Sequence, residues 1–135
     1  MPNALFHKGR EAFLDGIISW TSNTIRAVLV DLTKYTPAIE AHQWLADIPV
    51  EARIATSGPF DGKTATDGVA DANDITFPAV TGPQCSALVI YRDTGTASTS
   101  RLIALIVSAA GLPVLPSGND INIQWDAGDN KIFKL

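Results

Sequence analysis

Cysteine and basic residues are both scarce in this chain. Its one cysteine, Cys85, lies within an apolar run, so no intramolecular disulfide can form and the thiol is interpreted as a small buried hydrophobe. The 10 Lys and Arg residues are scattered and are outnumbered by 14 Asp and Glu residues, which gives a net charge of −4. Because there is no basic patch, we expect no direct contact with nucleic acid.

Long hydrophobic runs are missing as well. The longest apolar region, residues 102–115, is shorter than the roughly 20 residues that a membrane-spanning helix needs, and Gly111 and Pro113 interrupt it. Residues 1–11 reach a Gly, an Arg and a Glu too early for the apolar centre of a signal peptide. We therefore expect neither a membrane partner nor secretory export.

What the chain has instead is a series of short apolar stretches. Its 135 residues, 46% of them hydrophobic, suit one domain, which we assign to residues 1–135. β-Branched or alternating segments predict strands, and the Gly- and Asp-rich region 58–73 fits either further short strands or a long excursion. The predicted strands cover residues 24–33, 50–57, 75–80, 85–91, 102–107, 121–125 and 131–135, with a turn at 126–130.

Two short helices are predicted in the N-terminal third. Apolar or small residues at helical spacing favour a helix over 3–15, with Asn3 as its N-cap and Gly16 as its C-terminal stop. A Thr-Pro start followed by apolar residues at helical spacing favours a second helix over 37–46. The fold class expected is mainly β: an antiparallel β-sandwich, jelly-roll-like, with the N-terminal segment 1–22 packing on it or extending from it.

The paired runs 85–91 and 102–107 are apolar on both faces, whereas an antiparallel strand needs only one dry face. Each Leu or Ile left in water would forfeit roughly 1.5–3 kcal/mol, so both faces need a cover, either the N-terminal helices or another molecule. Alternation predicts that Cys85, Ala87, Val89 and Tyr91 oppose Leu88 and Ile90, and that Ile103, Leu105 and Val107 oppose Leu102, Ala104 and Ile106.

Residues that could carry chemistry form no recognisable motif. His7 and His42 have no His partner at metal-ligand spacing, and no Ser lies in a G-x-S-x-G context, so we expect no catalytic residue and no metal site. Residues 67–74 concentrate oxygen ligands that could suit Ca²⁺, but without an EF-hand pattern a turn with Asx caps is favoured. The D-T-G at 93–95 resembles that of aspartic proteases, and a dimer could supply a second copy; a hairpin loop with Gly95 in a left-handed conformation is favoured.

The three tryptophans have two interpretations. Trp20, Trp44 and Trp125 could line a carbohydrate site through their flat faces, but in a chain with 7% aromatic residues they are more often anchors of a core or an interface. A small hydrolase or a sugar-binding protein therefore remains an alternative that needs a pocket with convergent polar groups.

Several segments of the chain resemble small virion structural proteins of tailed bacteriophages. They are residues 3–10, 35–49, 63–69, 93–96 and 124–133. Within that group the chain is most similar to the capsid cement or decoration proteins of short-tailed phages that infect Bordetella.

This resemblance implies a non-enzymatic protein that needs no cofactor. Homodimers or higher homo-oligomers, assembled in the host cytoplasm, would lie on the outer surface of the virion head and clamp neighbouring major capsid subunits of HK97-like fold. A tail fibre, head–tail adaptor or receptor-binding virion protein is the alternative. The residues expected to contact the partner are Trp44, Leu45, Thr94, Thr96, Ser98, Ser100, Phe6 and Phe133.

Overall fold

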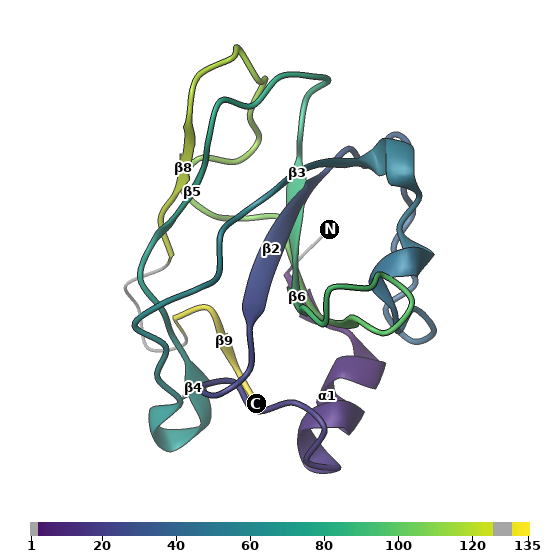
Figure 1. Ribbon diagram of the computed structural model, residues 1–135, viewed down its shortest axis with the longest axis vertical. Coiled ribbons are helices and arrows are strands. Elements are labelled where there is room, and N and C mark those ends of the chain that lie inside the picture. Colours follow the sequence, from purple (N-terminus) through teal and green to yellow (C-terminus); the bar gives the residue numbers. More distant parts are fainter. Residues whose placement is uncertain (1–2, 126–130) are drawn as a thin grey trace.

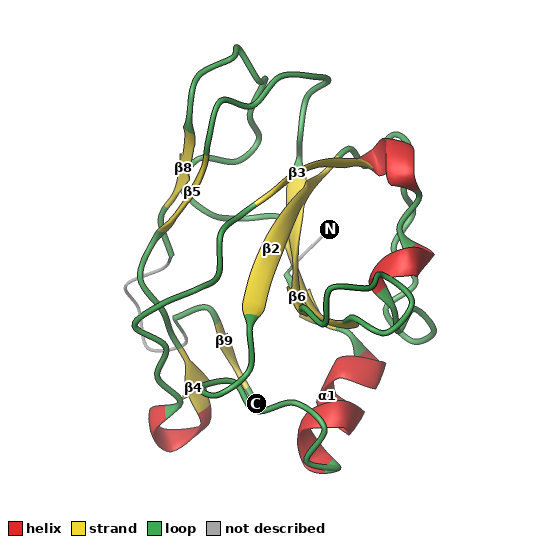
Figure 2. Cartoon of the chain, in the orientation of Figure 1, coloured by secondary structure: helices red, strands yellow, loops and turns green. Residues whose placement is uncertain are grey.

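The chain is mainly β, with antiparallel sheets and one short α-helix in the part that the structure describes (Figures 1 and 2). The computed structural model describes residues 3–125 and 131–135. A five-stranded sheet has the order β1-β7-β6-β2-β3, and β4–β9 and β5–β8 form two-stranded sheets. The elements are β1 (Ala4–Leu5), α1 (His7–Leu14), β2 (Ile25–Val30), β3 (Arg53–Thr56), β4 (Val69–Ala70), β5 (Ile75–Phe77), β6 (Ala87–Arg92), β7 (Arg101–Ile106), β8 (Ile121–Ile123), β9 (Phe133–Lys134) and 3-10 turns at Leu45–Asp47, Val50–Ala52 and Thr66–Gly68.

Both faces of the central strands β2, β6 and β7 are covered by the chain itself. On one face they pack against α1, the 18–20 segment and the small sheets, forming the helix-side core. On the other they pack against the long 31–52 connection, forming the loop-side core. The covering side chains include Ala12, Trp20, Phe60, Phe77 and Ile123 in the helix-side core, and Tyr35, Ile48 and Ala52 in the loop-side core.

The second cover is therefore a loop and not another molecule. Leu88, Ile90, Leu102 and Leu105 are each 0% exposed in the single chain. Every buried side-chain N or O atom in the described residues also has a hydrogen-bond partner. The two-faced strands are fully explained by intramolecular packing, so they do not by themselves point to a subunit interface.

A register shift in the β6–β7 ladder explains why the predicted alternation of side chains fails within β7. The β6–β7 ladder slips between Ile90 and Tyr91. Ile103 therefore lies in the helix-side core with Ala104 and Ile106, and Leu102 lies in the loop-side core with Leu105. A bulge adds one residue to one strand and turns the following side chains to the other face. Cys85, which precedes β6, also lies in the helix-side core, opposite to Ala87.

The N-terminal helix is shorter than predicted. Asn3 does not cap it, because the Asn3 Oδ1 accepts hydrogen bonds from the N–H groups of Val107 (2.7 Å) and Ser108 (3.0 Å), which ties the segment before β1 to the end of β7. The predicted stop is confirmed: Gly16 has φ +74°, directly after the helix ends.

The second predicted helix, over 37–46, is wrong. Tertiary hydrogen bonds replace helical ones: the N–H of Leu45 donates to the carbonyl of Ser100 (2.9 Å), and the N–H of Ala46 donates to the carbonyl of Ala97 (3.1 Å). Apolar residues at helical spacing here serve a loop whose backbone pairs with the β6–β7 hairpin, and only the 3-10 turn at Leu45–Asp47 remains.

The predicted strands are confirmed, most of them as shorter segments, and the strand predicted over 102–107 is observed one residue earlier as β7. Region 58–73 is a long excursion that contains the Thr66–Gly68 turn and β4. The predicted turn at 126–130 lies outside the described residues. Among the described helices, none has the length and apolar character required to cross a membrane.

Candidate partner-contact surface

The tip of the β6–β7 hairpin and the 43–47 segment form one surface. The N–H of Leu102 donates to the carbonyl of Gln43 (2.9 Å), and Trp44 bridges to Arg101, so the segment extends along the outer edge of β7 next to the tip. Figure 1 shows this hairpin loop beside the turns of the 36–52 connection. Two distant regions of the sequence, 43–47 and 93–101, thus meet here, and both contain predicted contact residues.

Hydroxyl groups hold the hairpin tip in one shape. Thr94 and Thr99 share a hydrogen bond of 2.5 Å between their hydroxyl oxygens, and the Ser100 hydroxyl donates to the carbonyl of Thr96 (2.8 Å). Gly95, with φ +88°, donates its N–H to a carboxylate oxygen of Asp93 (2.8 Å). The tip is a cross-bonded turn, which presents its remaining polar groups without a large entropic cost on binding.

An ion pair fixes the base of the hairpin. The Nε of Arg26 on β2 donates to Asp93 at 2.7 Å, and its Nη1 donates to the carbonyl of Ser57 (3.1 Å). The carboxylate of Asp93 is therefore occupied by a guanidinium and a backbone N–H. This arrangement confirms the hairpin-loop interpretation of the D-T-G sequence and gives Asp93 a structural role.

The Asp47 side chain bonds back to the start of the 43–47 segment. Its carboxylate accepts the N–H groups of Gln43 (2.8 Å) and Trp44 (2.9 Å). Burial opposes the charge of Asp47, but these two hydrogen bonds and nearby His42 outweigh it and hold the pKa of Asp47 below its usual value. The carboxylate stays ionised at neutral pH and caps both N–H groups.

His42 and Tyr35 form a stacked pair beneath the same segment. Their rings lie 5.5 Å apart, and the Tyr35 hydroxyl is 2.9 Å from the Nδ1 of His42, which also accepts the N–H of Ala38 (3.2 Å). Burial, assisted by the charge of Asp47, raises the pKa of Tyr35. The His42 ring thus takes part in packing and hydrogen bonding beneath the segment.

Two arginines occupy facing positions at the mouth of the hairpin. Arg92 and Arg101 are directly opposite each other as the last pair of the β6–β7 ladder, and both are partly exposed. The Arg101 guanidinium lies 4.5 Å from the ring centroid of half-buried Trp44. Sequence reasoning missed this pair, although the two arginines flank the predicted hairpin loop and their facing positions follow once it closes.

Not all predicted contact residues lie on this surface. Thr94, Thr96 and Ser98 are exposed, and Trp44 and Leu45 are half-buried beside them. Ser100 is buried within the tip and Phe6 is 0% exposed in the loop-side core, so neither presents its side chain to a partner. Phe133 lies elsewhere, on β9, where its ring packs at 6.0 Å from Phe13 and 5.2 Å from Trp20.

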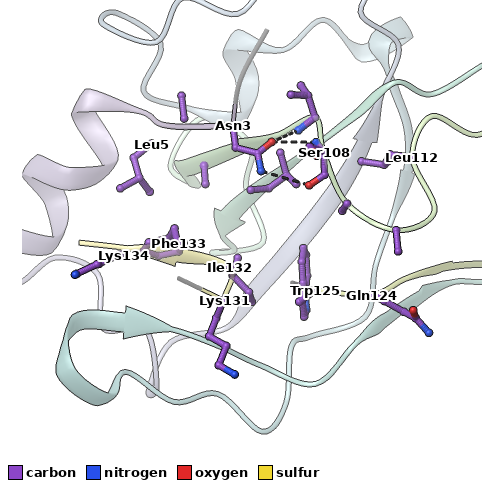
Figure 3. Close-up of a pocket in the computed structure, with 16 residues that line it drawn as sticks. Asn3, Leu5, Ser108, Leu112, Gln124, Trp125, Lys131, Ile132, Phe133 and Lys134 are labelled. Atoms are coloured by element: carbon purple, nitrogen blue, oxygen red, sulfur yellow. Dashed lines mark hydrogen bonds between the residues drawn. The ribbon is translucent and has the colours of Figure 1, made fainter. Parts of the chain in front are cut away.

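An open groove of about 980 Å³ lies near Phe133, between the N-terminal strand, the segment after β7 and the C-terminal strand (Figure 3). Trp125 stands in its wall, with its indole N–H donating to the carbonyl of Asn73 (3.0 Å) and its ring 5.6 Å from Phe60. Asn3 closes another wall through its bonds to Ser108. Of the three tryptophans, Trp125 lines this groove, Trp44 lies on the hairpin surface and Trp20 is buried in the helix-side core.

The oxygen-rich segment 67–74 is built from turns and caps. Asp74 accepts the N–H of Trp125 (3.0 Å), and the Asn73 amide donates to Asp61 (2.9 Å). No cluster of three or more His, Cys, Asp or Glu residues suited to a metal occurs within residues 3–125 and 131–135. The segment thus includes the end of the Thr66–Gly68 turn and strand β4, and its Asn73 and Asp74 side chains bond to distant parts of the chain.

No protein-family model matches the chain, and no curated protein matches it.

Proposed function

We propose that this protein is a non-enzymatic cement or decoration protein of a tailed-phage head. It would bind the outer surface of the icosahedral shell and stabilise contacts between major capsid subunits of HK97-like fold. In this proposal the five-stranded sheet and the two small sheets form a jelly-roll-like sandwich that acts as a rigid body for the contact surface.

The observation that carries the proposal is the pairing of the hairpin tip with the 43–47 segment. The phage resemblance predicts that residues from both segments contact a partner, and the backbone N–H groups of Leu45 and Ala46 bond directly to the tip. A surface that is held by its own hydrogen bonds loses little freedom when it docks on a lattice. The apolar faces of β6 and β7 give no support, because the chain itself covers them.

The proposed mechanism is stapling by a homodimer. A dimer that spans two neighbouring capsomers binds twice, and the second contact forms at a high effective concentration. Individual contacts can then be modest while the assembled shell gains resistance to the pressure of packaged DNA. Repetition over the lattice multiplies the effect without any new contact.

Binding to heads that lack the protein tests this function. Purified protein is mixed with such heads and cosedimented, and the heads are then heated. We expect saturable binding, a higher temperature of DNA release, and weaker binding by Trp44→Ala than by Leu115→Ala, a control at a side chain that is 70% exposed and outside the surface. Failure of the wild-type protein to bind or protect these heads would contradict the proposal.

A further inference from the structure

The facing arginines at the mouth of the hairpin are unusual for a sheet. Arg92 and Arg101 occupy opposite positions on adjacent antiparallel strands, where side chains lie about 4.5–5.5 Å apart at Cβ. Like charges at such positions repel and destabilise the pair. Both residues are partly buried, which limits the shielding that water provides.

Within the described part of the chain, neither of these two arginines takes part in an ion pair. The ion pairs among residues 3–125 and 131–135 are Lys8–Glu11 and Arg26–Asp93, and neither Arg92 nor Arg101 donates a side-chain hydrogen bond there. The other partly buried arginines differ: Arg26 has Asp93 and the Ser57 carbonyl, and Arg53 has the Ile48 carbonyl.

Two acidic groups that the sequence and the fold place at this hairpin, Asp93 and Asp47, are already engaged in other bonds. Asp93, which follows Arg92 directly, is bound to Arg26 and to the N–H of Gly95, and Asp47 accepts the N–H groups of Gln43 and Trp44. Trp44 meanwhile stacks on the Arg101 guanidinium and restrains it. An arginine that is oriented on one face by an aromatic ring retains N–H donors at its edge.

We propose that Arg92 and Arg101, with Trp44 as a side wall, bind a carboxylate side chain on the surface of a partner protein. A guanidinium fork matches the two oxygens of a carboxylate, and the second arginine adds charge-assisted donors. A protein carboxylate fits better than a nucleic acid because the chain carries a net charge of −4 and has only this small cationic cluster on the hairpin.

The identity of the partner rests on the proposed function, in which the carboxylate belongs to an Asp or Glu on the outer face of the major capsid protein. The existence of the site does not rest on it. Since the site adjoins the hairpin tip, one acidic side chain on the lattice could engage the arginines while the tip hydroxyls contact its neighbours.

NMR titration of the full chain with the peptide acetyl-Glu-Glu-amide tests the site. Saturable shifts are expected at the Nε–H groups of Arg92 and Arg101 and at the indole N–H of Trp44. The double variant R92Q/R101Q should bind at least about tenfold more weakly, a loss of one charge-assisted contact or more. Lys134→Gln, which removes an exposed charge on β9, should bind like the wild type.

The same titration contains the results that would overturn the inference. They are the absence of saturable shifts, equal binding by the double variant, equal binding of acetyl-Gln-Gln-amide, or a response at these residues to inorganic phosphate but not to the peptide. Head binding by R92Q/R101Q is measured in parallel and should fall with peptide binding. If the peptide binds and wild-type protein does not bind heads, the site stands and the proposed function fails.

Discussion

Replacing Arg92 by glutamine should stabilise the protein, because it removes a like-charge pair that the fold does not compensate. Cross-strand pairs measured in sheets contribute about 0.2–1 kcal/mol. Since Arg92 and Arg101 are partly exposed, we expect R92Q to raise the free energy of unfolding by about 0.5–1 kcal/mol at low salt.

Urea unfolding at two ionic strengths measures this effect. The Debye length falls from about 30 Å at 0.01 M to about 3 Å at 1 M, so the advantage of R92Q should shrink as salt is added. Arg26→Gln is a matched control with the opposite sign, because Arg26 forms a 2.7 Å ion pair with Asp93 and is expected to lose stability on substitution. A destabilised R92Q, or a gain that does not depend on salt, would refute the reasoning.

Three further predictions concern Gly9, Cys85 and Asp47. Gly9→Ala should lower the free energy of unfolding by about 1–3 kcal/mol, although alanine has the better helix propensity, because the added Cβ would lie 2.6 Å from the carbonyl oxygen of Leu102. Gly58→Ala is the control: no atom lies within 4 Å of the added Cβ, so the change should be nearly neutral in the same urea assay. Burial, assisted by the charge of Asp31, raises the pKa of Cys85 to about 11, so its thiol should resist Ellman's reagent at pH 8 until urea unfolds the chain; rapid labelling of the native protein would contradict this. The pKa of Asp47 is lower in the folded state than its unfolded-state value of about 3.9, so the ionised carboxylate stabilises the fold above that pH. This contribution disappears as the pH falls through the folded-state pKa, and Asp47→Asn should therefore lose less stability than wild type between pH 6 and pH 3. An unchanged pH dependence of unfolding would count against this role of Asp47.

The central strands could be predicted from the sequence because their signal is local. Ile25–Val30, Ala87–Arg92 and Arg101–Ile106 are dense in β-branched and apolar residues, and their pairing follows from a hairpin and adjacent strands. The face of the sheet on which each side chain lies was less predictable. The register shift after Ile90 places Ile103 in the helix-side core, and alternation in the sequence does not reveal a bulge.

The 31–52 connection shows what local patterns miss. Its apolar residues at helical spacing predict a helix, yet they pack the loop-side core from a segment whose N–H groups bond to the hairpin and to Asp47. That outcome depends on partners more than 50 positions away, such as Ser100, which bonds to Leu45. Tertiary hydrogen bonds therefore override a local helical preference here.

The partner-contact residues stay predictions, but the fold shows which of them lie on one surface. The loop 94–100 and the Trp44–Leu45 pair were identified from resemblance, and the fold brings them together. Phe6 was wrong as a contact residue because an aromatic side chain near the terminus fills the loop-side core. The facing arginines became visible only through the register of β6 and β7, which pairs Arg92 with Arg101.

The most direct test of the proposed function is the number of copies of this protein per purified virion, measured by quantitative mass spectrometry against the major capsid protein. A cement protein should be present in a ratio near one to one with the capsid subunit, or at least in hundreds of copies. A count of about three to twelve would contradict the account and place the protein on the tail or portal axis, and absence from the particle would remove the virion role altogether.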